Sequence, residues 1–105
     1  MFYITGEFPN NIQSCFITWK GKRYSSEQFE VLGYFESTWN KITNQVVPVC
    51  AVEGGRLNTG EVMYICRVKY SNGFSVGRVL NGTCQVPIYS PKGEQDFNTY
   101  EILCV

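Results

Sequence analysis

The chain of 105 residues contains the same pattern twice. Each copy has an opening that begins with glycine, then a cysteine, then a closing aromatic-Glu-aliphatic-Leu motif. In the first copy these features lie at 6–8, at Cys15 and at 29–32. In the second copy they lie at 77–79, at Cys84 and at 100–103. A repeat of this length is one supersecondary unit that packs against its neighbour. We therefore interpret residues 1–105 as a single domain, in which 1–36 form the second half of one unit and 37–105 form a complete unit.

The composition excludes several classes of protein. Hydrophobic residues make up 44% and charged residues 17% of the chain, which is typical of a folded globular domain. Nine basic and nine acidic residues are scattered without a basic stripe, so we expect no nucleic-acid partner. No apolar run approaches the roughly 20 residues that a membrane helix needs, so we expect no membrane span.

The cysteines bear on the compartment. The five cysteines are Cys15, Cys50, Cys66, Cys84 and Cys104. They form no CxxC pair, and residues 1–5 lack the basic and apolar regions of a signal peptide. We therefore expect mostly buried thiols and a cytoplasmic protein, with a secreted or cell-surface role left open. On this interpretation the glycosylation motif Asn81-Gly82-Thr83 has no consequence, because such motifs are modified only in secreted proteins.

The hydrophobic pattern predicts strands almost everywhere. Apolar residues alternate with a period of two at 15–19 and 84–88, and 62–68 is a near-continuous apolar run typical of a strand buried on both faces. Further strands are predicted around 29–35, 74–80 and 100–105, with Asn72-Gly73 supplying the positive φ angles of a hairpin turn. We therefore predict an all-β fold of antiparallel sheets, a small sandwich or prism with an internal pseudo-twofold repeat.

The order of motifs in the second part is specific. From Trp39 onward the motifs are Val-Pro-Val-Cys-Ala at 47–51, Gly-Gly at 54–55, Tyr64 and Arg67, Gly-Arg-Val at 77–79, Cys-Gln-Val-Pro at 84–87, Gly-Glu at 93–94 and Tyr-Glu-Ile-Leu-Cys at 100–104. This order resembles the DM-nine repeat of natterin-like proteins. The resemblance covers nearly the whole chain, because 6–34 match the second half of another repeat.

The resemblance implies a fold and a ligand. Family members are all-β tandem repeats with pseudo-twofold symmetry, and several bind mannose-type sugars in innate recognition. In those members an acidic residue after the Gly-Gly and the lysine of Pro-Gly-Lys contact the sugar hydroxyls. Here Leu57 stands at the acidic position, Arg78 at the lysine position, and Glu7 at the lysine position of the half repeat.

The candidate ligand-binding residues are Arg78, Arg56, Asn58 and Glu53. Arg78, Arg56 and Asn58 would donate to sugar hydroxyls, and Glu53 would accept from them in place of the missing acid. Tyr64 or Tyr89 would offer an aromatic face. The alternative is that Arg56 and Asn58 are solvated loop residues and that Arg78 is a surface cation on a strand.

Other polar and aromatic residues have structural interpretations. Arg67 lies in the apolar run at 62–68, so it needs a partner, and we expect an ion pair with Glu101 or Glu30. We interpret Trp19 and Trp39 as core residues, with stacking on a ligand as the alternative.

The sequence does not favour an enzyme. It contains no histidine, which excludes Cys–His and Ser–His–Asp arrangements and removes the commonest zinc ligand. Carboxylate pairs for glycoside hydrolysis can be drawn, but no spacing recommends one. We expect no catalytic residues, no metal site and no cofactor.

The preferred hypothesis is a non-catalytic, carbohydrate-binding recognition module for mannose-type glycans. The alternative is a divergent relative without sugar binding that serves as a protein-interaction or assembly module. We also expect a homo-oligomer, because the chain has two tail halves but one head half, and the uncovered surface would be buried against a second copy.

Overall fold

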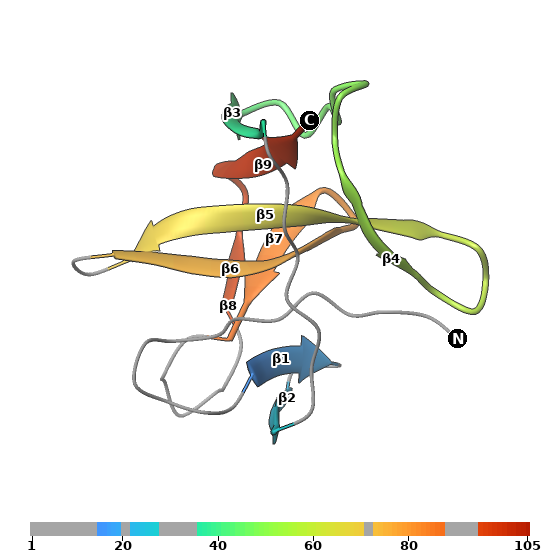
Figure 1. The fold of residues 1–105 in the computed structure, drawn as a ribbon, viewed down its shortest axis with the longest axis vertical. Coiled ribbons are helices and arrows are strands. Elements are labelled where there is room, and N and C mark those ends of the chain that lie inside the picture. Colours follow the sequence, from blue (N-terminus) through green and yellow to red (C-terminus); the bar gives the residue numbers. More distant parts are fainter. Residues whose placement is uncertain (1–14, 20–21, 28–35, 71–72, 88–94) are drawn as a thin grey trace.

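The computed structural model describes residues 15–19, 22–27, 36–70, 73–87 and 95–105, and these ranges contain strands and no helix (Figure 1). The strands are β1 (Cys15–Trp19), β2 (Lys22–Ser26), β3 (Thr38–Ile42), β4 (Glu53–Arg56), β5 (Val62–Tyr70), β6 (Gly73–Leu80), β7 (Thr83–Val86), β8 (Gln95–Phe97) and β9 (Tyr100–Cys104). Every pairing among them is antiparallel. The predicted all-β fold is therefore confirmed. The strand predicted at 29–35 lies outside the described residues.

The strands form one large sheet and one separate hairpin. The large sheet has seven strands in the order β3-β9-β5-β6-β7-β8, with β4 also paired to β5. Along one edge of β5, β4 pairs with residues 62–64 and β9 with residues 66–67, while β6 pairs along the other edge. β1 and β2 pair only with each other. Most of the half repeat lies outside the described residues, so its symmetry relation to the full repeat stays a prediction.

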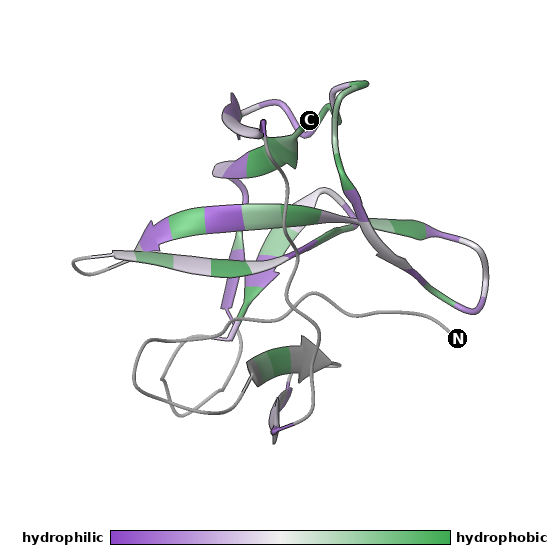
Figure 2. Cartoon of the chain, viewed as in Figure 1, coloured by the Kyte–Doolittle hydropathy of each residue, from purple (hydrophilic) through white to green (hydrophobic). Residues whose placement is uncertain are grey.

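Side-chain alternation along the strands gives the large sheet two buried faces. One face carries a cluster that includes Cys66, Val68, Val79 and Ile102, and the other carries Ile65 and Leu103 with the loop residue Val52. Figure 2 shows the alternating hydropathy along β5 and β6. The prediction that 62–68 are buried on both faces is confirmed, because successive residues of a strand point to opposite sides.

The sheet curls around the first cluster. Cys66 on β5 and Cys84 on β7 lie on either side of β6, yet their Cα atoms are only 6.0 Å apart. Two strand spacings in a flat sheet would separate them by about 9.6 Å. Gly77 of β6 permits this approach, since a Cβ there would overlap the main-chain carbonyl of Gln85. The glycine that opens the Gly-Arg-Val motif at 77–79 is therefore a packing requirement.

Two disulfides correct the expectation of buried thiols. Cys50 pairs with Cys104, and Cys66 pairs with Cys84. The first joins the loop before β4 to the end of β9, and the second joins β5 to β7 across β6. Disulfides persist in oxidising compartments and are rare in the cytosol. The side chain of Cys15 lies outside the described residues.

Two hairpins share β6. β5 and β6 pair up to Tyr70 and Gly73, which confirms the predicted hairpin, and the residues of its turn, 71–72, lie outside the described residues. The turn from β6 to β7 has positive φ angles at Asn81 (54°) and Gly82 (77°). An Asn-Gly pair with both φ angles positive is the preferred two-residue hairpin loop, since its twist matches that of the strands.

Within the described ranges no helix is long and apolar enough to cross a membrane.

Candidate functional site

The candidate site lies on the hairpin formed by β4 and β5. Its turn is closed by hydrogen bonds from the main-chain nitrogen of Leu57 to the oxygen of Glu61 (2.8 Å) and from Gly60 to Leu57 (2.9 Å). Gly60 has a φ of 92°, a conformation that glycine adopts without steric cost. The turn therefore has a defined shape that fixes the residues just before it.

A β-bulge brings two of the predicted residues together. The register of β4 against β5 shifts between Glu53 and Gly55, so that Glu53 pairs with Tyr64 and Arg56 with Val62. Tyr64 and Val62 are two residues apart and share a face, so Glu53 and Arg56 share it too. In a regular strand two residues three positions apart would point to opposite faces.

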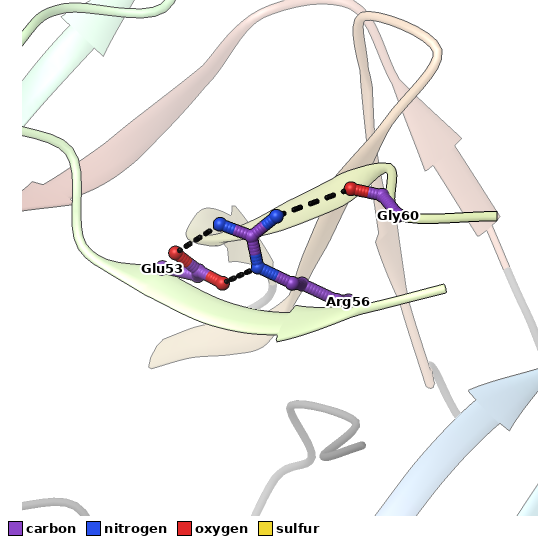
Figure 3. A network of polar contacts seen from close by, with 3 residues as sticks. All are labelled: Glu53, Arg56 and Gly60. Carbon is purple, nitrogen blue, oxygen red and sulfur yellow. Dashed lines mark hydrogen bonds and ion pairs between the residues drawn. The ribbon is translucent and has the colours of Figure 1, made fainter. Parts of the chain in front are cut away.

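Glu53 and Arg56 form a bidentate ion pair (Figure 3). The Nε of Arg56 donates to Oε1 of Glu53 at 2.5 Å, and Nη2 donates to Oε2 at 3.3 Å. Nη1 donates to the main-chain oxygen of Gly60 at 3.3 Å, which ties the pair to the turn. Both side chains remain accessible, with 45% of Glu53 and 56% of Arg56 exposed. The pair is therefore a pre-oriented polar patch at the surface.

Asn58 and Leu57 flank this pair. Asn58 is exposed in the turn, two residues after Arg56, and its predicted role as a donor stays a prediction. Leu57 is half-buried, and its apolar side chain offers no hydrogen bond at the position where the family resemblance implies an acid. The acids on this hairpin are Glu53, on the other side of the Gly-Gly pair, and Glu61, at the end of the turn.

Arg78 lies elsewhere. It pairs with Ile65 of β5 and with Gln85 of β7, so it points to the face opposite Tyr64, Glu53 and Arg56. Its exposed fraction is 2%, and it is the largest of the fully buried side chains among the described residues. The interpretation of Arg78 as a surface cation is therefore wrong. Its predicted role as a ligand contact remains untested, but a ligand at Glu53 and Arg56 would approach from the other face.

A second polar cluster surrounds Arg67. Its Nε donates to Oε1 of Glu101 at 3.0 Å, which confirms the predicted ion pair. The guanidinium carbon lies 4.5 Å from the ring centre of Trp39 and 3.9 Å from that of Phe74. Trp39 also packs against the second core cluster, in keeping with its predicted core role. Phe74, whose ring is half-exposed, was not among the predicted residues; it pairs with Lys69 in the β5–β6 hairpin.

The remaining predicted residues carry little chemistry. Tyr64 is half-buried against the first core cluster, and Tyr89 lies outside the described residues. Burial raises the pKa of the Tyr100 phenol above its ordinary value of 10.0, and its hydroxyl donates to the oxygen of Gly82 at 3.3 Å. In the part of the chain that the structure describes, no three cysteine, histidine or acidic side chains are grouped as metal ligands.

Comparison with known families gives one match. The model of the DM9 repeat matches residues 3–97, which is most of the chain and includes the β4–β5 hairpin. No curated protein matches significantly. No solved structure does so either. The family match confirms the resemblance seen in the order of the sequence motifs.

Proposed function

Because the chain belongs to the DM9 repeat family, we propose that it is a non-catalytic, lectin-like module that binds mannose-type glycans in innate recognition. The observation that carries the proposal is the exposed ion pair of Glu53 and Arg56 on the β4–β5 hairpin. Asn58 in the adjacent turn completes the site.

The ion pair has the donors and acceptors that neighbouring sugar hydroxyls require. Among the described residues, Arg56 engages three of the five N–H groups of a guanidinium, which leaves two for a ligand. Each oxygen of Glu53 accepts one of these bonds and keeps a second lone pair for a hydroxyl donor. Because the carboxylate and guanidinium already hold each other in place, a sugar would not have to order them on binding.

Arg78 is far less accessible to a ligand than Arg56. Its 2% exposure means that it could contact a ligand only if the groups covering it moved. The hairpin pair needs no such movement. We therefore assign sugar contact to Glu53, Arg56 and Asn58 and treat Arg78 as a support of the opposite face of the sheet.

Calorimetry with mannose-type oligosaccharides, chosen from a glycan array, tests the site. Glu53→Gln and Arg56→Ala should each weaken binding by about tenfold or more, because a hydrogen bond to a charged group is worth roughly 1.5–3 kcal/mol. Glu101→Gln is a matched control, since it alters the ion pair with Arg67 on the other face. If the hairpin variants bind as the parent does, the site is wrongly assigned. If the parent binds no glycan on the array, the lectin function itself fails.

Assembly is the second candidate function. Val49 is fully exposed and Val105 is 62% exposed, and the two are brought close because the main-chain nitrogen of Val105 donates to the oxygen of Cys50 at 3.2 Å. A contact with another chain would remove these two exposed valines from water. We propose that this contact is with a second copy, which makes the module multivalent toward clustered glycans.

The disulfides support a proposal about the compartment. Cytoplasmic location was expected from thiols, but the pairs Cys50–Cys104 and Cys66–Cys84 favour an oxidising environment. We propose that the module acts outside the cytoplasm, where mannose-type glycans are displayed.

A further inference from the structure

The turn between β6 and β7 carries a motif that the lectin function does not use. Asn81-Gly82-Thr83 is the chain's one Asn-x-Ser/Thr sequence in which x is not proline. It lies between Leu80 and Cys84, so it occupies the whole of the two-residue loop and the first position of β7. Asn81 and Gly82 are also the residues that a two-residue hairpin loop prefers, so the motif by itself does not indicate glycosylation.

The disulfides supply a second, separate observation. Attachment of a glycan to asparagine takes place in the compartment where disulfides form, and the two pairs described above belong to such a compartment. Cys84, the residue immediately after the motif, is itself bonded to Cys66. The motif was expected to have no consequence because the cysteines were expected to be free thiols. These four cysteines are paired instead.

The folded turn can carry a glycan without rearrangement. The turn is anchored through its other residues: the oxygen of Gly82 accepts from Tyr100, and the hydroxyl of Thr83 donates to the oxygen of Leu80 at 3.1 Å. A Cβ on Gly82 would lie 3.1 Å from the side-chain oxygen of Gln45, so this side of the turn is packed. Asn81 is exposed, and a group attached to its side chain would extend into solvent.

We propose that Asn81 is an acceptor for N-linked glycosylation. In the reaction, Nδ2 of Asn81 bonds to the anomeric carbon of an oligosaccharide carried on a lipid diphosphate. The bond from that carbon to the diphosphate oxygen breaks, the lipid diphosphate leaves, and the amide nitrogen gives up one proton. No oxidant or metal redox step is involved, and the side-chain amide persists as a substituted amide.

Expression of the full chain behind a secretion leader in a eukaryotic host tests the proposal. Peptide mass spectrometry should find an oligosaccharide on Asn81 that peptide N-glycosidase removes, and the same should hold for Thr83→Ser, which keeps the hydroxyl. Asn81→Asp is the matched control, because aspartate also tolerates a positive φ before glycine but lacks the amide nitrogen. It should carry no glycan.

Two results would overturn the proposal. One is a secreted parent chain that contains both disulfides and an unmodified Asn81. The other is a glycan that persists in Asn81→Asp, which would place it on another residue. Because peptide masses report attachment whether or not a variant folds, a destabilised turn cannot obscure the outcome. The glycan-binding measurements at Glu53 and Arg56 are independent of this experiment.

Discussion

Removal of either disulfide should cost much of the stability of this domain. A cross-link stabilises mainly by restricting the unfolded chain, and the effect grows with the length of the loop that it closes. The Cys50–Cys104 pair spans 54 residues and the Cys66–Cys84 pair spans 18. The chain-entropy relation then gives losses of roughly 4.2 and 3.2 kcal/mol at 25 °C. Since small domains are stable by about 5–15 kcal/mol, a variant that lacks one of the two bonds should lose a large part of its stability and still show an unfolding transition.

The burial of the cysteines also affects how much stability each disulfide variant loses. Cys66 and Cys84 have no exposed surface, whereas Cys50 is only half-buried. Substituting both of the fully buried residues by alanine leaves a cavity in the first core cluster, which adds to the entropy loss. We therefore expect the Cys66→Ala/Cys84→Ala variant to lose at least as much free energy of unfolding as its loop length alone predicts, and to approach the loss of Cys50→Ala/Cys104→Ala.

Urea unfolding of protein produced under oxidising conditions would measure both losses. Free energies extrapolated to water should be compared rather than midpoints, because removing a cross-link also expands the unfolded chain and changes the slope. Alkylation of the denatured, unreduced parent is the control and should label one cysteine, against five after reduction. Five labels without reduction, or double variants as stable as the parent, would refute the reasoning.

Three further outcomes are expected. Gly77→Ala should destabilise the fold by about 1–3 kcal/mol or more, because its methyl group would overlap the Gln85 carbonyl. Gly73→Ala is the control, since no atom lies near a Cβ at that position. Equal melting temperatures for the two variants would contradict the packing role of Gly77. The free energy of unfolding should fall as pH rises above 10.0, because Tyr100 ionises at a lower pH in the unfolded chain than in the fold, where burial raises its pKa. Tyr100→Phe should lose about 0.5–1.5 kcal/mol at neutral pH, because the hydrogen bond to Gly82 is lost, and should lose less stability than the parent when pH is raised. Parallel pH profiles for the two proteins would count against the assignment. Light scattering should show an oligomer that Val49→Asp weakens, and a parent of 12.0 kDa at micromolar concentration would exclude self-association.

The fold could be predicted because strand periodicity is a local property. The double-sided apolar run at 62–68 became β5, and the alternation at 15–19 became β1, since each depends only on which side chains neighbour one another along the chain. The partner of Arg67 was also predictable, because a cation in an apolar strand must find an anion and Glu101 was one of the two candidates.

The buried arginine and the disulfides could not be predicted in this way. Arg78 is buried because β6 lies between β5 and β7, and strand order is not a property of any one segment. The cysteine pairs likewise join segments that come together only in the folded chain, the loop before β4 with β9 and β5 with β7. The spacing of the cysteines along the chain carried no information about which of them approach each other.

The candidate site depends on the Gly-Gly pair between Glu53 and Arg56, where neither β4 nor its bulge was predicted. Glycines within a strand often mark a bulge, and here the bulge places two side chains three positions apart on one face. Deleting Gly54 would leave the two residues two positions apart in a regular strand, so both should keep the same face and glycan binding should survive.

Deleting Gly54 and Gly55 together would make Glu53 and Arg56 adjacent, and adjacent residues of a strand point to opposite faces. This variant should lose the ion pair and bind glycan about tenfold more weakly or worse, while its far-UV spectrum stays that of a β protein. Calorimetry on the two deletions compares them directly, and the single deletion controls for shortening β4. If the double deletion binds as well as the single one, the shared face of Glu53 and Arg56 does not make the site.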